Sequence, residues 1–419
     1  MKSIEMKRLH VLHIVSLALL AVIFISACSN SYTLRSNEFM DLYDRNDEFR
    51  PEAYVRQFHP DSAYVYVTFR TKELLYKRKD AEQPYVARMQ VNATVKALDL
   101  LERGDTTAYI FKDEQERSKD DVVTGRFSIH VEDTMKYEVK VDFIDLQSER
   151  IRSEYIFLQT YPDDLRYMDV KIEGEPKRYC ACESGQELEL KPYWGVDAAI
   201  WNIMELERNP APLPFSMTLN QVNSEKKISE IKPLKGPKGW YKISCPHGNS
   251  IKLSFESSKT WVIPVFQKDF PWISGVESMT APLRYITTND EFDELRFSLD
   301  KQKAVSSFWL NCAPDEVRAK KLLSSYYKRV EEANLYFTDS FSEGWKSDRG
   351  LVYVAYGPPS RIIRSQGKEV WYYSVENADF GLQMHFLEGK KVKLDRSLDY
   401  RQSWYLTVDS WRNGKVSNL

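Results

Sequence analysis

The sequence predicts a mainly β protein with an α+β C-terminal domain, in which tandem Ig-like β-sandwich modules come first. Three observations support this fold class. Aromatic residues make up 13% of the 419 residues, including 25 Tyr and 10 Trp, and favour β-rich packing. Short runs that alternate between apolar and polar residues recur from about residue 53, whereas the pattern becomes helical after Tyr285. The length is enough for two or three domains with cores of their own.

The N-terminus has the pattern of a signal peptide. Lys2, Lys7 and Arg8 make its first residues basic, and an apolar stretch runs from Val11 to Ile25. Fifteen helical residues rise about 22 Å, which is less than the roughly 30 Å hydrocarbon core of a bilayer. We therefore expect residues 1–27 to be a cleaved leader and not a permanent transmembrane anchor.

The apolar stretch ends in Ile25, Ser26, Ala27 and Cys28. These residues resemble a bacterial lipobox, with Ile25 in the place of the usual Leu. The resemblance implies that Cys28 receives several acyl chains, and more than one chain makes membrane attachment stable. It implies a lipid-anchored protein of the cell envelope, by default on the periplasmic face of an outer membrane, because neither an aspartate nor an acidic cluster follows Cys28. The alternative is an ordinary signal peptide followed by a coincidental cysteine.

The segment after the cleavage site is polar and has no sustained apolar period. We expect residues 28–51 to be a tether with room for a short helical piece. Loss of the leader changes the formal net charge from −2 to −4, since the leader holds three cations and one acid. A nearly neutral protein has no basic field to gather nucleic acid, so we expect no nucleic-acid partner.

Residues 52–174 are expected to form the first Ig-like β-sandwich. Seven runs alternate with a period of two residues, and turns or charged segments such as residues 112–121 separate them. The runs are Ala63–Phe69, Tyr85–Val95, Thr106–Phe111, Gly125–Val131, Tyr137–Ile144, Glu154–Gln159 and Tyr167–Ile172.

Residues 177–286 are expected to form a second, smaller β-rich domain that carries more Pro, Trp and Gly. Its expected strands are Phe215–Leu219, Trp240–Ser244, Ile251–Phe255 and Trp261–Phe266.

The cysteines of the second domain fit an exported protein. Cys180 and Cys182 are too close on one strand to bridge to each other easily. A disulfide from either of them to Cys245 is compatible with export, and the candidate pair is Cys182 with Cys245. No metal site is expected, because structural zinc sites space their cysteines as C-x₂₋₄-C with matching partners.

Residues 287–419 are expected to form the α+β domain. A first helix would carry Phe292, Leu295, Leu299, Phe308 and Trp309. A second helix would begin at Pro314, Asp315 and Glu316. One face of that second helix would hold Val317, Leu323, Tyr327, Val330, Asn334 and Phe337.

Residues 344–359 read Gly-Trp-Lys-Ser-Asp-Arg-Gly-Leu-Val-Tyr-Val-Ala-Tyr-Gly-Pro-Pro, and Glu369-Val-Trp-Tyr-Tyr373 follows. This resembles the GWxTD domain, an envelope-associated family of Bacteroidetes and related bacteria with the pattern GWxTDRGxxYIxYGPP and an EVWxY-like strand. The resemblance covers about residues 287–419. Ser347 replaces the Thr of the name motif and keeps a hydroxyl. Asn311-Cys312-Ala313-Pro314 replaces the family's Arg-Asp-Pro, so any chemical task of that aspartate would be missing here.

The motif has two interpretations. In the structural one, Gly344, Ser347 and Gly350 shape or cap a turn before a strand over residues 351–356, which Gly357, Pro358 and Pro359 end. Trp345 would then lie in a core, and Asp348 would pair with Arg349 or a helix end. In the functional one, aromatic platforms and a charged pair line a groove for a glycan or a peptide. Its lining residues would be Trp345, Asp348, Arg349, Tyr356 and Trp371.

No catalytic, metal or cofactor motif is found in the sequence, so we expect no catalytic residues and no cofactor. Cys245 with His247, or Asp348 with His385, would be the best pairs for a hydrolase. We expect a noncatalytic envelope lipoprotein that acts as a binding or scaffold protein through its C-terminal domain. Its partners would be the membrane, through the N-terminal lipid, and another envelope protein or a glycan. The alternatives are a glycan- or peptidoglycan-binding lipoprotein and, behind that, a hydrolase.

Overall fold

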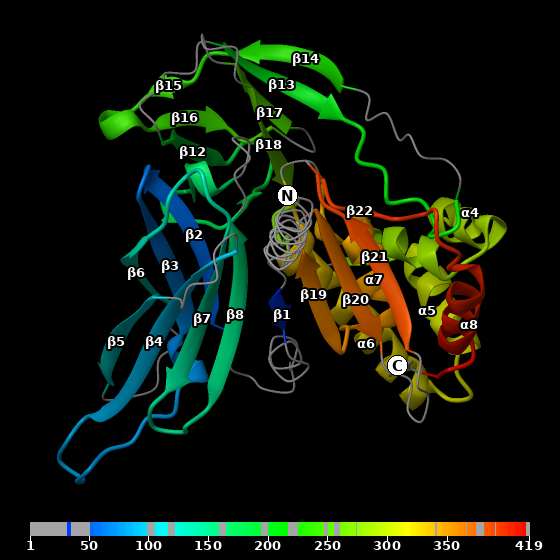
Figure 1. The fold of residues 1–419 in the computed structure, drawn as a ribbon, viewed down its shortest axis with the longest axis horizontal. Helices are drawn as coiled ribbons and strands as arrows, with labels where there is room; N and C mark the ends of the chain where they lie inside the picture. Colours follow the sequence, from blue (N-terminus) through cyan, green and yellow to red (C-terminus); the bar gives the residue numbers. More distant parts are fainter. Residues whose placement is uncertain are drawn as a thin grey trace, which may run out of the picture.

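The computed structural model describes most of the chain from residue 51 onward (Figure 1). The expected leader and Cys28 lie outside the described residues. In the part that is described, no helix combines the length and the apolar character needed to span a bilayer. The described ranges are the backbone of 32–34 and residues 51–98, 105–115, 122–158, 165–193, 200–216, 225–246, 250–254, 260–273, 275–339, 342–365, 367–373, 381–389 and 391–415.

The first body is an antiparallel β-sandwich. Much of its core comes from inward positions that alternate along β3, β4 and β7, such as Val65, Val67, Val91, Val139 and Val141, all fully buried. One sheet has the order β2 (Glu52–His59), β3 (Ser62–Arg70), β6 (Val122–His130), and the other β5 (Asp105–Gln115), β4 (Tyr85–Ala97), β7 (Tyr137–Asp145), β8 (Ile151–Leu158).

The second body is also built from two sheets. Its core includes Trp201, Leu188 and Ile251. One sheet has the order β10 (Glu175–Pro176), β9 (Met168–Ile172), β12 (Glu187–Pro192), β16 (Tyr241–Ser244), β15 (Leu234–Lys235), and the other β11 (Cys180–Ala181), β18 (Thr260–Phe266), β17 (Ser250–Ser254), β13 (Ile200–Leu206), β14 (Glu225–Ile231). Short 3-10 turns η1 (Thr71–Glu73), η2 (Leu165–Tyr167) and η3 (Pro237–Gly239) lie between strands.

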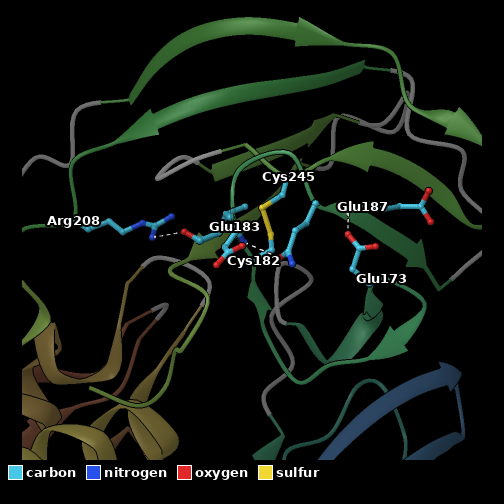
Figure 2. Close-up of a disulfide and its surroundings, with 8 residues drawn as sticks. Glu173, Cys182, Glu183, Glu187, Arg208 and Cys245 are labelled. Atoms are coloured by element: carbon cyan, nitrogen blue, oxygen red, sulfur yellow. Dashed lines mark hydrogen bonds between the residues drawn. A yellow bond between two sulfur atoms is a disulfide. The ribbon is translucent and has the colours of Figure 1, made fainter. Parts of the chain in front are cut away.

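A disulfide joins the two sheets of the second body (Figure 2). Cys182 directly follows β11 of one sheet, and Cys245 directly follows β16 of the other. Their Cα atoms are 6.4 Å apart, within the range that a disulfide spans. Both cysteines are buried, at 4% and 2% exposure. The predicted pair Cys182 and Cys245 is therefore confirmed, and Cys180 is a free, buried thiol.

The C-terminal body packs helices against a sheet. The helices are α3 (Gly275–Thr280), η4 (Ala281–Tyr285), α4 (Asn289–Phe297), α5 (Lys301–Asn311), α6 (Glu316–Phe337), η5 (Gly344–Lys346), α7 (Asp348–Tyr356) and α8 (Arg401–Arg412). The sheet has the order β1 (Tyr32–Leu34), β19 (Arg361–Ser365), β20 (Lys368–Tyr373), β21 (Leu382–Leu387), β22 (Lys393–Leu394). This body and the two sandwiches confirm the predicted fold class, mainly β with an α+β C-terminal part.

Part of the predicted tether lies on this sheet. The backbone of β1 pairs antiparallel with β19, with Thr33 opposite Ile363. Figure 1 shows β1 between the first sandwich and the C-terminal sheet. A segment only a few residues after position 28 therefore pairs with the sheet of the C-terminal body.

The strand predicted over residues 351–356 is wrong, because these residues form helix α7. The run Leu-Val-Tyr-Val-Ala-Tyr is rich in β-branched and aromatic residues, which favours a strand. Each of its six side chains is buried at 0–1% exposure. A helix that is apolar on all sides is stable when it is enclosed in a core, so here packing overrides local preference.

Three further expectations need correction. The run Tyr167–Ile172, expected in the first sandwich, forms β9, which pairs with β12 in the second body. The single helix expected from Phe292 to Trp309 is two helices, because the Asp300 side chain accepts from the backbone N–H of Lys303 (2.9 Å) and starts α5 there. Leu299 is consequently fully exposed in the connection. Phe215 is in a turn and not in the strand expected over 215–219, of which residues 217–219 lie outside the described part. The prolines before it cannot donate to a strand ladder.

Candidate functional site

The two glycines that flank the motif turn allow close backbone packing. A Cβ on Gly344 would lie 1.9 Å from the backbone oxygen of Ala333 on α6. A Cβ on Gly350 would lie 1.9 Å from the backbone oxygen of Gly344. Both contacts are far shorter than any real Cβ contact. The glycines therefore let η5, α6 and α7 meet at backbone distance.

The middle of the motif starts helix α7. The Ser347 hydroxyl accepts a hydrogen bond from the backbone N–H of Gly350 (3.0 Å) and donates to the backbone carbonyl of Gly344 (2.7 Å). Ser347 is thus the N-cap residue of α7, and Asp348 follows in the first helical turn. A threonine has the same hydroxyl, which explains why the departure from the family pattern preserves the turn.

Asp348 fastens three separate segments to one another. Its carboxylate accepts from the backbone N–H of Leu394 in β22 (3.0 Å) and forms a buried, two-pronged ion pair with Arg396. The Arg396 guanidinium also donates to the carbonyls of Pro212 (2.7 Å) and Leu213 (3.3 Å). Charge-assisted bonds of this two-pronged kind hold both position and direction. The motif aspartate therefore binds the C-terminal body to the segment that crosses over from the second body.

Trp345 belongs to the same junction. Its backbone N–H donates to the Asn334 side chain (3.2 Å), and its backbone carbonyl accepts from the Tyr285 hydroxyl (3.1 Å). The rings of Trp345 and Tyr285 meet edge to face at 5.8 Å. Trp345 is 5% exposed, so its ring is a core contact.

The groove expected along the motif is not what the structure shows. Trp345, Asp348, Tyr356 and Trp371 are buried at 0–9% exposure and bond to other parts of the protein. Burial raises the pKa of Tyr356 to about 12, and its hydroxyl shares a hydrogen bond with Ser403 (3.2 Å). The sequence motif identifies these residues, but it does not show whether their side chains are exposed or buried. Arg349 alone among the five is half-buried, with its guanidinium over the Phe337 ring at 5.2 Å.

Trp371 and its neighbours form a buried polar group at β20. The Trp371 indole N–H donates to the Glu369 carboxylate (2.6 Å), which also pairs with Arg364. Burial of Glu369 opposes its ionisation, but the charges of Arg364 and Arg349 outweigh that effect and lower the pKa of Glu369. Arg349 thus has an internal electrostatic partner, and ligand binding through Arg349 stays a prediction.

The two residue pairs considered for a hydrolase are not assembled in the described residues. Cys245 is oxidised in the disulfide, and His247 lies outside the described part. The hydrogen bonds of Asp348 go to Leu394 and Arg396, and none goes to His385. In the same described residues, no group of three or more His, Cys, Asp or Glu side chains is arranged to hold a metal ion.

An open cavity of about 270 Å³ lies where the three bodies meet. Glu52 comes from the first body and Leu335 of α6 from the C-terminal body. The segment before β11, β11 itself and the loop after β18 supply the rest: Lys177, Arg178, Tyr179, Ala181, Lys268, Asp269, Phe270, Pro271 and Trp272.

The walls of this cavity are fixed by contacts between bodies. Arg178 donates to the carbonyl of Leu335 (3.0 Å), and the Asn334 amide donates to the carbonyl of Pro271 (3.0 Å). The Tyr179 ring meets the Phe270 ring edge to face at 5.0 Å. This cavity could not be predicted from the sequence, because its residues come from four distant stretches of the chain. The burial around Glu52 at the start of β2 is visible only in the structure.

The family model of the GWxTD domain matches residues 250–413. The chain therefore carries a GWxTD domain over those residues, which start before the predicted boundary at 287. None of the curated proteins matches the chain. Among solved structures, red sea bream transglutaminase is similar at 12% identity and a TM-score of 0.17, over 52% of this chain and 31% of that one. The chain thus spans about a third of that protein's length, and a similarity this low supports no inference about fold or activity.

Proposed function

We propose that this chain is a noncatalytic lipoprotein of the cell envelope that acts as a binding or scaffold protein through its GWxTD domain. The observation that carries the proposal is the Asp348–Arg396 pair. Its polar atoms bond to β22 and to the carbonyls of Pro212 and Leu213. The motif aspartate thereby holds segments of this chain in a fixed arrangement, which would present a defined surface to a partner.

Contacts between the other bodies support the same proposal. Arg56 of the first body donates to the carbonyl of Arg178 in the second (2.6 Å), and Arg178 reaches the C-terminal body through Leu335 (3.0 Å). Tyr66 of the first body donates to the Asp169 carboxylate of the second body (3.4 Å), and Tyr193 of the second body donates to the same carboxylate. Buried polar contacts of this kind orient domains relative to one another. A fixed arrangement of three bodies presents a defined surface to a partner.

The envelope location rests on the N-terminal pattern and on the disulfide. The lipobox-like residues before Cys28 support acylation at that cysteine. Disulfides persist in oxidising compartments outside the cytosol, so the Cys182–Cys245 bond supports export. We place the protein at the outer membrane, on the periplasmic side.

The lipid anchor is tested with the full chain expressed in a bacterium that processes lipoproteins. We expect the wild-type protein to carry acyl groups by mass spectrometry and to fractionate with membranes. Cys28→Ser should lose both properties. Cys312→Ser, which removes a buried thiol elsewhere, is the matched control and should keep them. Unprocessed wild-type protein with its leader and no lipid mass would sink the location.

The scaffold role is tested separately by crosslinking in the native envelope. We expect one or more envelope proteins to be enriched with the wild-type chain, and fewer with a variant in which Asp348→Asn loosens the GWxTD domain. Retention on peptidoglycan without any enriched protein would instead support the glycan-binding alternative. Turnover of an envelope substrate by the purified chain would contradict a noncatalytic role.

A further inference from the structure

The carboxyl group of Glu52 is the unusual feature of the three-body cavity. Glu52 is the first residue of β2, and its half-buried side chain lines the cavity. Its carboxylate makes no hydrogen bond or ion pair with another residue in the described part of the chain. The neighbouring acid, Glu154, is by contrast satisfied, because it accepts from the backbone N–H of Ala53 (2.9 Å) and lies 3.9 Å from Arg178.

None of the cations that line the cavity forms an ion pair with Glu52 in the described residues, although the charge of Arg178 acts on it from a distance. Arg178 donates to the Leu335 carbonyl and faces Glu154. Lys268 pairs with Glu183 at 2.9 Å. Lys177 is exposed at the rim and forms no ion pair with Glu52. A carboxylate that is partly withdrawn from water and has no ion-pair partner is destabilised, and a cation entering the cavity would relieve that cost.

The remaining walls suit a cation on an apolar stem. Tyr179, Phe270 and Trp272 contribute aromatic rings, and aromatic faces attract ammonium and guanidinium groups. Phe270 is stacked on Phe266 at 4.0 Å, so its ring is held in place. Rigid walls need no ordering when a ligand enters, which favours binding.

We propose that this cavity binds a single basic side chain, a lysine or an arginine, of a partner protein, with Glu52 as its counter-ion. Pockets for drug-sized ligands measure about 300–1,000 Å³, and this cavity of about 270 Å³ fits one side chain better than a polymer. A contact between Glu52 and a basic side chain of a partner is more specific than the proposed scaffold role. It stands whether or not Cys28 is acylated.

Electrostatics around Glu52 agree with this assignment. Burial and the nearby Glu154 raise the pKa of Glu52, with Glu73 adding to the effect, while Arg178 and Arg152 oppose it. The protein therefore keeps a carboxyl group that costs stability when ionised. Strained electrostatics of this kind are typical of binding sites.

The test is an NMR titration of the purified full chain in detergent, observed on the ligand. The probes are Nα-acetyl-lysine N-methylamide, the arginine analogue, the uncharged glutamine analogue and butylamine. We expect the two basic peptides to bind and the glutamine analogue not to bind. Glu52→Gln should weaken binding by about tenfold or more, since it removes the charged partner of a buried pair. Glu175→Gln, the same change at an exposed carboxyl outside the cavity, should leave binding unchanged.

Three results would overturn the inference. The first is equal binding to the wild type and to Glu52→Gln, with the variant shown to be folded by its thermal midpoint. The second is equal binding of the glutamine analogue. The third is binding of butylamine that is as tight as that of the peptides, which would assign the cavity to free amines and not to a partner's side chain.

Discussion

Single residues of the GWxTD domain are conspicuous in the sequence and enclosed in the structure. Asp348 and Arg396 are 48 positions apart, and their side chains are 10% and 7% exposed. Breaking a buried ion pair by removing one partner leaves an uncompensated charge, which costs far more than the loss of an exposed pair. The C-terminal body is therefore sensitive to a single change at this pair.

We expect Asp348→Asn to lower the free energy of unfolding of the C-terminal body by about 3 kcal/mol, because Arg396 keeps its buried charge without an anion. Urea unfolding followed by tryptophan fluorescence measures this. The same change should cost less in an Arg396→Gln background, where no buried cation remains. Glu316→Gln, in the exposed pair with Lys320, is the control and should leave the midpoint unchanged. An equal cost in both backgrounds would contradict the pairing.

Glu52 should make stability depend on pH in a particular direction. Its pKa is raised in the folded protein above the ordinary value of 4.5. Below pH 4.5 the carboxyl is protonated in both states, and as pH rises to the folded pKa the unfolded state ionises first, so the wild type loses stability. We expect Glu52→Gln to have the higher thermal midpoint at pH 8 and the same midpoint as wild type at pH 4. A difference that is independent of pH would contradict a raised pKa.

Among the elements, helix α7 shows how packing can override local preference. Its apolar run favours a strand, yet the capped turn before it and the core around it enforce a helix. The Ser347 cap is the local signal for the helix start, since serine followed by aspartate is typical of a first helical turn. That signal was present in the sequence, and the β-branched residues outweighed it in the prediction.

The cap of α7 can be tested by two substitutions at one position. We expect Ser347→Ala to lower the stability of the C-terminal body by about 1 kcal/mol, because the N–H of Gly350 loses its acceptor. Ser347→Thr restores the residue of the family pattern and should be close to neutral. Thermal unfolding monitored by circular dichroism compares the two variants. If alanine and threonine had the same effect, the hydroxyl would have no capping role.

At the scale of the whole molecule, polar contacts hold the three bodies together, and a disulfide joins the two sheets of the second body. The Cys182–Cys245 bond closes a loop of 63 residues between the sheets of the second body (Figure 2). Closing a loop of that length in the unfolded chain is worth about 4 kcal/mol in the chain-entropy account. The bond also joins sheets whose own edges are short, since β11 and β15 have two residues each.

We expect the double variant Cys182→Ser with Cys245→Ser to lose about 4 kcal/mol of unfolding free energy in the second body. Urea unfolding with and without reductant measures this. Reductant present during unfolding should lower the wild type to the level of the variant and have no further effect on the variant. An unchanged wild-type midpoint after verified reduction would show that the bond adds nothing to stability.

Part of the fold was predictable because its signals are local. Alternation along β3, β4 and β7 marked the first sandwich, and the cysteine positions limited the disulfide to two pairings. Strands β2 and β14 escaped prediction for opposite physical reasons. The middle of β2 is buried at five consecutive residues, so it shows no alternation, whereas most residues of β14 are exposed and charged.

The sequence by itself determined the elements that carry a local period and the identity of the GWxTD motif, and the predictions of export and lipidation at Cys28 rest on the sequence alone. Only the tertiary structure decided that Asp348 pairs with Arg396, that Trp345 and Trp371 are enclosed, and that Glu52 faces a cavity built from three bodies. The physical reason is distance along the chain. Periodicity and capping act over a few residues, whereas burial and ion pairing depend on segments that meet only when the chain has folded.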